Sequence, residues 1–256
     1  MVRGMDLHPL VAGFTDVADE YEAGRPGYPP EVVAALGERL ALPDAARIAD
    51  VGAGTGKLTR ALFAAGFDVV AIEPLAGLRA RLLEVVPGVE VLDGAAEALP
   101  LAGASVDAVA CANAFHWFDA PRAVAEFARV IRPGGVLALI WHDGVEDDDS
   151  QPWSRELLAV IQDSRPAHPA YTEDQGRGAV AAHPAFGALD RTEVRSTYAT
   201  DSRRILAHVA SMSWVGGLPP AEREALLGRA AAVLERHAVE SVRVPLATTL
   251  WTARRT

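Results

Sequence analysis

The stretch from Ile48 to Gly56 constrains this chain more than any other feature. It reads Ile-Ala-Asp-Val-Gly-Ala-Gly-Thr-Gly, a short apolar strand followed by glycines at alternate positions. A helix-like run over 58–63 comes next, and a second apolar strand over 68–72 leads directly into Glu73. Glycines let the backbone pass close to a ligand, and an acid at the tip of the next strand can hold ribose hydroxyls. The layout predicts a nucleoside-binding βαβ unit.

The glycine spacing distinguishes between classes of nucleotide site. A dinucleotide site needs Gly-x-Gly-x-x-Gly, but here the third glycine comes one residue early and Lys57 occupies the expected glycine position. A phosphate-binding loop would need glycine at Val51 and serine or threonine at Leu58, and the chain has neither. A nicotinamide-dependent dehydrogenase is therefore disfavoured.

Composition narrows the class of protein. The chain has 256 residues, is 50% hydrophobic and carries a formal net charge of −10. We expect one domain over 1–256, with an N-terminal cap (1–45), a cofactor-binding core (46–142) and a C-terminal half with a helical insertion (143–256). No cluster of Lys and Arg supports nucleic-acid binding, and no histidine pair has metal-ligand spacing. The chain shows no signal-peptide pattern or membrane-length apolar run, so we expect a cytoplasmic protein.

Strand and helix patterns alternate along the chain. Short apolar runs with little polar alternation are typical of parallel strands buried on both faces. The expected strands are 47–51, 69–72, 89–92, 106–112, 136–141, 192–198 and 242–251. The expected helices are 16–22, 31–40, 58–65, 75–86, 121–130, 154–162, 203–213 and 220–237. This order predicts a doubly wound, Rossmann-like α/β sheet. The Pro-Gly-Gly at 133–135 is expected to stop a helix and reverse the chain.

The sequence Asp50-Val51-Gly52-Ala53-Gly54-Thr55-Gly56 resembles the first motif of class I S-adenosylmethionine-dependent methyltransferases. Specific motifs carry the resemblance over about residues 17–142. The further segments that resemble the family are 94–100, 105–109, 113–118 and 129–137. Residues 21–29 resemble the N-terminal segment of trans-aconitate-type and related small-molecule methyltransferases, where it covers the cofactor site. The resemblance implies a seven-stranded, mostly parallel sheet closed by a C-terminal antiparallel hairpin.

The resemblance also implies S-adenosyl-L-methionine as cofactor and a small-molecule acceptor as substrate. In the family the glycine turn holds the methionyl and ribose parts, and the loop after the third strand packs on the adenine. Many relatives carry an acid where Ala95 stands, which leaves Glu97 or backbone to contact the adenine amino group. Tyr21 would cap the methionyl end and Arg25 would pair with a carboxylate, or both would only pin their segment to the domain. The implied cofactor-binding residues are Tyr21, Arg25, Gly52, Ala53, Gly54, Thr55, Glu73, Pro74, Ala96, Glu97, Asn113, Phe115 and Trp117.

The candidates for chemistry follow the fourth and fifth strands. Methyl transfer is an in-line displacement, so positioning supplies much of its acceleration. Phe115 and Trp117 are candidates to stabilise the sulfonium with their ring faces, and both suit a core-filling role equally. His116 is the candidate base for a hydroxyl acceptor, although a histidine between two aromatic residues is often structural. His142 and Asp143 share the same rim, and a carboxylate acceptor would need no base.

The acceptor pocket is expected between the N-terminal segment 21–29, the turn 115–117, Trp141 with His142, and the helical insertion that holds Met212, Ser213 and Trp214. The alternative is that Trp214 only packs within its own helix. The sequence leaves the acceptor, the methylated atom and the oligomeric state open. The leading function is methylation of a small metabolite. The alternative is a non-catalytic protein that binds S-adenosylmethionine without turning it over.

Overall fold

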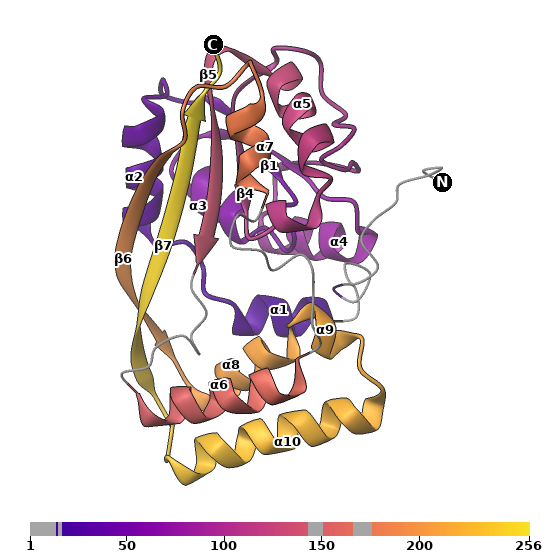
Figure 1. The fold of residues 1–256 in the computed structure, drawn as a ribbon, viewed down its shortest axis with the longest axis vertical. Helices are drawn as coiled ribbons and strands as arrows, with labels where there is room; N and C mark the ends of the chain where they lie inside the picture. The colour runs from indigo at the N-terminus through magenta and orange to yellow at the C-terminus, as the bar shows by residue number, and fades with distance from the viewer. Residues whose placement is uncertain (1–13, 15–16, 143–150, 166–175) are drawn as a thin grey trace.

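The computed structural model describes residue 14 and residues 17–142, 151–165 and 176–256. They form a seven-stranded sheet with the strand order β3-β2-β1-β4-β5-β7-β6 (Figure 1). The strands are β1 (Arg47–Val51), β2 (Asp68–Ile72), β3 (Glu90–Leu92), β4 (Val106–Ala112), β5 (Ile131–His142), β6 (Asp190–Thr200) and β7 (Val242–Arg254). β1 to β5 run parallel, and β7 is antiparallel to both β5 and β6. The predicted fold class and its C-terminal hairpin are confirmed.

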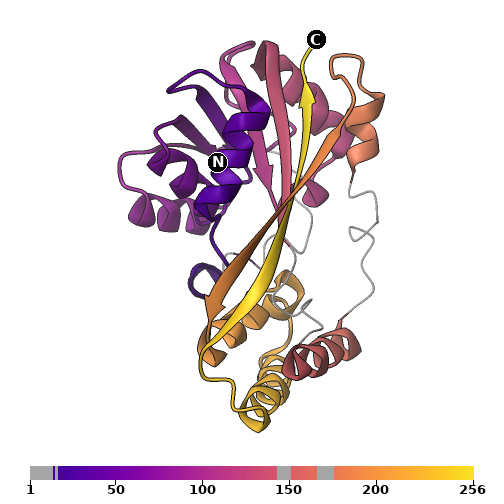
Figure 2. The same ribbon diagram turned by 90° about the vertical axis from the view of Figure 1, so that its left-hand side faces the viewer.

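Helices cover both faces of the parallel part of the sheet (Figure 2). The helices α2 (Pro30–Leu40), α3 (Lys57–Ala64) and α4 (Ala76–Val85) pack on one face. The helices α5 (Ala120–Val130) and α7 (Arg177–Ala182) pack on the other. Each face therefore has its own apolar core, which is why the central strands read as continuous apolar runs rather than as an alternating pattern.

β5 differs from its predicted span because it begins at Ile131 instead of Val136. Ile131 pairs with Val106 and Val136 pairs with Ala108, so the Pro-Gly-Gly segment forms a bulge within the strand. Gly134 has a φ of 80°, and an added Cβ on Gly135 would overlap the carbonyl oxygen of Asp107. The segment follows the end of α5 directly and lies within β5, between β4 and β7, rather than in a separate reversing turn.

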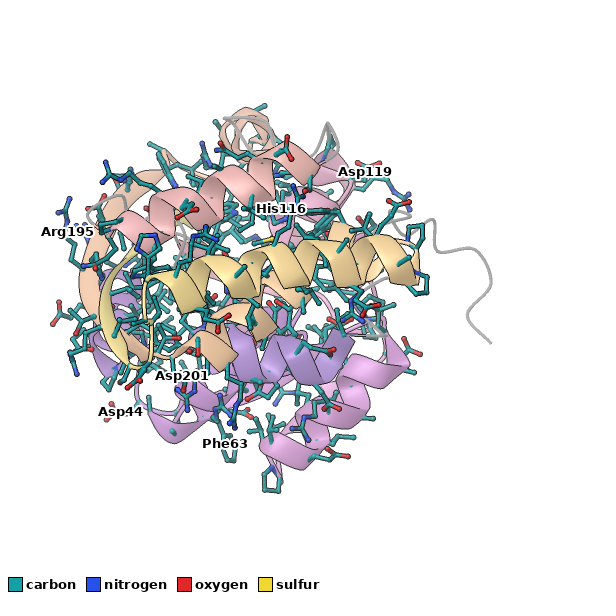
Figure 3. The ribbon with its side chains drawn as sticks, turned by 90° about the horizontal axis from the view of Figure 1, so that it is seen from below. Asp44, Phe63, His116, Asp119, Arg195 and Asp201 are labelled. Carbon is teal, nitrogen blue, oxygen red and sulfur yellow. The ribbon has the colours of Figure 1, made fainter. Side chains whose placement is uncertain are left out.

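A third apolar core lies away from the sheet, in what we call the helical lobe. It consists of α6 (Pro152–Ser164), α8 (Ser202–Ala210), α9 (Ser213–Gly216), α10 (Pro220–Arg236) and the far half of the β6–β7 hairpin. Residues 242–247 of β7 pair only with β6, so this part of the hairpin extends beyond β5 to the lobe (Figure 2). α6 and α10 lie side by side across the end of the molecule (Figure 3). We propose that the lobe is an insertion in one domain spanning 1–256.

One expectation for this lobe was wrong. The predicted helix over 203–213 ends at Ala210, where Ser211 caps α8 and donates its hydroxyl to the His208 carbonyl at 2.7 Å, and the separate helix α9 begins at Ser213. Trp214 is 5% exposed and packs in the core of the lobe together with Met212. This burial supports the alternative in which Trp214 is a packing residue, and the place of the acceptor pocket stays a prediction.

Helix α1 (Ala18–Gly24) lies between the sheet and the helical lobe (Figure 1). Its predicted first residue, Asp16, lies outside the described residues. Gly24 packs so closely on α8 that an added Cβ would overlap the main-chain nitrogen of His208. The absence of a side chain at this position lets the two helices meet.

We expect Gly24→Ala to destabilise the protein by about 1–3 kcal/mol, because the methyl group has no space between the two backbones. Thermal unfolding measures this effect. Gly27→Ala is the matched control, since a Cβ there meets nothing within 4 Å. Equal unfolding temperatures for the two variants would contradict the close contact between α1 and α8.

Candidate cofactor site

The glycine turn joins β1 to α3 at the carboxyl edge of the sheet. Gly52, Gly54 and Gly56 have φ angles of 71°, 59° and 86°, in the left-handed region that side chains other than glycine rarely adopt. A Cβ on Gly52 would also lie 2.7 Å from the Cβ of Ala114. The alternating glycines are therefore required by the path of the backbone, and this path leaves open space on both sides of the turn.

One side of the turn opens into an apolar pocket of about 770 Å³, including the space at its mouth. Its walls come from the loops that follow β1, β2, β3 and β4, from the start of α4 and from the N-terminal residues Phe14 and Tyr21. The predicted residues that line it are Tyr21, Gly52, Gly54, Glu73, Pro74, Ala96, Glu97, Asn113 and Trp117.

Glu73 is the buried acid of the apolar pocket. It is 4% exposed, and its carboxylate accepts hydrogen bonds from the backbone N–H groups of Gly54 and Leu75, each at 2.9 Å. Burial raises the pKa of Glu73 to about 7, although these two bonds favour the ionised form. Carboxylate oxygens accept more than one hydrogen bond each, so Glu73 retains capacity for hydroxyl donors of a ligand.

The other side of the turn opens into a polar pocket. It is lined by Tyr21, Arg25, Pro26, Tyr28, Asp50, Gly52, Ala53, Lys57, Leu58, Ala112, Asn113, His142 and His208. Asp50 is 1% exposed, and its Oδ2 accepts a 2.6 Å hydrogen bond from Thr59. Its Oδ1 has no hydrogen-bond partner among the described residues. Burial raises the pKa of Asp50 to about 6. An unsatisfied buried carboxylate oxygen beside open space favours a cationic or donor ligand.

The two pockets adjoin, because Tyr21, Gly52, Ala112 and Asn113 line both of them. Asn113 adopts an uncommon φ of 50° at the end of β4. Its Oδ1 accepts from the backbone N–H of His142 at 3.1 Å, and its Nδ2 donates to the Tyr28 hydroxyl at 3.2 Å. Non-glycine residues in this conformation cluster at functional sites.

Aromatic side chains form part of the wall of the apolar pocket. The ring of Phe14 meets those of Tyr21 and Trp117 edge to face, with both centroid distances at 5.9 Å. The guanidinium carbon of Arg25 lies 5.5 Å from the centroid of the Tyr21 ring. Tyr21 therefore contacts both the aromatic side chains of the apolar pocket and the Arg25 guanidinium of the polar pocket.

Most of the residues predicted from sequence meet at these pockets, but Thr55, Phe115 and His116 line neither of them. Thr55 is fully buried and donates its hydroxyl to Glu22 at 2.8 Å. Phe115 is 1% exposed and packs against Phe118 and Phe127 in the core, so it fills the core. Glu97 lines the apolar pocket while its Oε1 accepts from the backbone N–H of Asp119.

His142 is the histidine of the fifth strand that reaches the polar pocket. Its Nδ1 lies 2.7 Å from the Thr248 hydroxyl oxygen, and its ring stacks on Tyr28 with centroids 4.2 Å apart. Burial lowers the pKa of His142 to about 4, which keeps the ring neutral at pH 7. Asp143 lies outside the described residues.

Four residues that line the polar pocket are not among the cofactor-binding residues predicted from the sequence, namely Tyr28, Asp50, Lys57 and His208. Asp50 and Lys57 flank the glycine turn, so their spacing to the turn could have identified them. Tyr28 lies in the same N-terminal segment as Arg25. His208 had no such signal, because it reaches the pocket only through the packing of α8 on α1.

We expect ligand binding to depend on pH through Glu73. Its pKa is about 7 in the folded protein against an ordinary value of 4.5, so between these values the folded chain holds a proton that the unfolded chain has released. The stability of the protein without ligand should therefore fall as the pH rises through this window. Affinity for a ligand whose hydroxyls donate to the carboxylate should rise over the same window, because binding favours the ionised form.

Calorimetric titration with S-adenosylhomocysteine at about pH 6 and pH 8, in buffers of different protonation enthalpy, measures this effect. We expect proton release on binding at the lower pH and up to about tenfold tighter binding at the higher pH. Glu73→Gln should lose the proton release that comes from Glu73. If Glu73→Gln released as many protons on binding as the wild-type protein, the released proton would come from a group other than Glu73.

No helix within the described ranges has the length and apolar character needed to cross a membrane. A family model of a methyltransferase domain matches residues 49–139. An uncharacterized methyltransferase of Mycobacterium tuberculosis is 39% identical over 225 residues, which are 88% of this chain and 86% of that protein. An uncharacterized methyltransferase-like protein of Schizosaccharomyces pombe is 31% identical over 211 residues, covering 82% and 80% of the two chains.

A solved structure gives a similar result for the whole fold. A protein from Anaeromyxobacter dehalogenans, described as a candidate type II methyltransferase, superposes with a TM-score of 0.67 at 26% identity. The superposition covers 90% of this chain and 97% of that one. The likeness therefore includes the helical lobe region as well as the segment that the family model matches.

Proposed function

This chain belongs to the class I S-adenosylmethionine-dependent methyltransferases, and we propose that it transfers the methyl group to a small-molecule acceptor from a cofactor lying across both pockets. The observation that supports this placement is the pair of adjoining pockets on the two sides of the glycine turn. One is largely apolar and contains a buried acid, and the other contains charges of both signs. A ligand with a nucleoside at one end and an amino acid at the other matches this division.

The residues present fit such a cofactor. The adenosyl part would lie in the apolar pocket, with Glu73 to accept hydrogen bonds from the ribose hydroxyls. The amino-acid end would lie in the polar pocket, where the free oxygen of Asp50 suits the ammonium group and Arg25 and Lys57 suit the carboxylate. Gly54 contributes open space, since a Cβ at this position would meet no protein atom within 4 Å.

When bound, S-adenosylmethionine supplies a methyl group on a sulfonium, which an acceptor takes by in-line displacement. Trp117 and Tyr21 line the apolar pocket beside Phe14, and their ring faces would favour a cation there by about 0.5–2 kcal/mol. We propose His142 rather than His116 as the histidine beside the bound cofactor, since His142 borders the polar pocket and stays neutral.

Incubation of the protein with a metabolite extract and cofactor labelled in the methyl group tests the proposed function. The expected result is label in a low-molecular-mass product. Gly54→Val, which should not bind the cofactor, is the control for background transfer. Label found only in protein or nucleic acid, or in no product although the wild-type protein binds S-adenosylhomocysteine, would overturn the proposal.

A further inference from the structure

Glu22, on helix α1, connects this helix to the glycine turn. Its Oε2 accepts a 2.8 Å hydrogen bond from the Thr55 hydroxyl, and its Oε1 lies 3.1 Å from the guanidinium of Arg60. The Lys57 ammonium donates to the main-chain oxygen of Glu22 at 2.8 Å and lies 3.4 Å from its Oε2. One carboxylate thus contacts the turn and the first turn of α3 through three side chains.

Two of the three charged side chains in these contacts are largely buried. The side chains of Glu22 and Lys57 are 14% and 9% exposed, whereas that of Arg60 is 44% exposed. Burial disfavours the charge on Glu22, but Lys57, Thr55 and Arg60 together hold the pKa of its carboxyl below the ordinary value. Partly buried charge pairs are screened by salt less than surface pairs, so the attraction between Glu22 and Lys57 depends less on ionic strength than that of an exposed ion pair.

The same helix and the residue that follows it supply two of the pocket residues. Tyr21 lines both pockets, and Arg25, immediately after the helix, lines the polar one. The Nε of Arg25 donates to the Ser211 hydroxyl at 3.0 Å, and Gly24 packs against His208, so this part of the chain is also held by the helical lobe. The position of Tyr21 and Arg25 over the glycine turn therefore depends on how α1 is joined to the turn, and Glu22 makes that joint.

We propose that Glu22 is a positioning residue for cofactor binding, which fixes α1 on the glycine turn so that Tyr21 and Arg25 face the cofactor. The inference rests on the proposed function, because it assumes that the adjoining pockets bind S-adenosylmethionine. Glu22 itself lines neither pocket, so its effect on affinity passes through α1 and through Lys57.

Calorimetric titration of Glu22→Gln with S-adenosylhomocysteine tests the proposal. Glu20→Gln is the matched control, because Glu20 lies on the same helix but pairs at 3.0 Å with Arg223 of α10. We expect affinity to fall about tenfold for Glu22→Gln, and by less than about twofold for Glu20→Gln. With S-adenosylhomocysteine bound, amide hydrogens in α1 should exchange faster in Glu22→Gln than in the wild-type protein, because α1 is then held less firmly on the glycine turn.

A second variant keeps the proposal testable if Glu22→Gln does not fold. Thr55→Val removes the hydroxyl that donates to Glu22 and should weaken binding in the same direction, by about three- to tenfold. Wild-type affinity in each of Glu22→Gln and Thr55→Val that folds would overturn the positioning role while leaving the proposed function intact. Equal weakening in Glu22→Gln and Glu20→Gln would also overturn it, whereas a wild-type protein that does not bind at all would overturn the proposed function itself.

Discussion

Gly54→Val is expected to abolish cofactor binding while the sheet remains folded. Gly54 has a φ of 59°, a conformation that strongly disfavours a β-branched residue. A side chain would meet no protein atom near its Cβ, so it would extend into the apolar pocket that Gly54 lines. The variant therefore strains the turn and fills the cofactor space at once. It should also disturb the 2.9 Å bond from the Gly54 N–H to Glu73.

Calorimetric titration with S-adenosylhomocysteine, together with circular dichroism and thermal unfolding, measures these effects. Gly88→Val is the matched control, because Gly88 has a φ of 91° and open space around its Cβ but lines neither pocket. Backbone strain alone should lower the stability of both variants, and only Gly54→Val should lose binding. A folded Gly54→Val protein with wild-type affinity would show that the cofactor lies elsewhere.

Glu73→Ala is expected to weaken S-adenosylhomocysteine binding by about 10- to 100-fold, because hydrogen bonds to an ionised carboxylate contribute roughly 1.5–3 kcal/mol. The variant also removes the acceptor for the Gly54 and Leu75 N–H groups, which could loosen the turn. Glu73→Gln separates these effects, since its amide oxygen can still accept one backbone bond but carries no charge. We expect its affinity to lie between those of the wild-type protein and Glu73→Ala.

Glu90→Ala is the control for the loss of one negative charge from a residue of the sheet that does not line either pocket. Glu90 begins β3, pairs with Arg47 and lines neither pocket, so its loss should leave cofactor affinity unchanged. Wild-type affinity in a folded Glu73→Ala protein would remove Glu73 from the site. Equal losses in Glu73→Ala and Glu90→Ala would attribute the effect to net charge rather than to a contact with the ribose.

The sequence was informative where one local pattern determines both the backbone and the chemistry. The glycines at 52, 54 and 56 require left-handed φ angles, and Glu73 follows directly on the next parallel strand, so their meeting at one edge of the sheet follows from the fold. Neighbouring parallel strands end together, which also brought Asn113 to the pocket. These positions could be predicted without knowledge of any distant contact.

Other features could not be predicted because they depend on packing between distant segments. The residues 115–117 form a single 3₁₀ turn, in which consecutive side chains point in different directions. Trp117 therefore reaches the apolar pocket while Phe115 enters the core, and composition alone cannot separate them. His208 and Ser211 approach the N-terminal segment only because Gly24 lets α1 pack on α8.

A crystal structure with S-adenosylhomocysteine bound tests the central claim most directly. The account predicts the adenosyl part in the apolar pocket, with ribose hydroxyls within hydrogen-bond distance of Glu73. It predicts the amino-acid end in the polar pocket, with its ammonium near Asp50 and its carboxylate near Arg25 or Lys57. A ligand bound in the reverse direction, or one that leaves either pocket empty, would contradict the account.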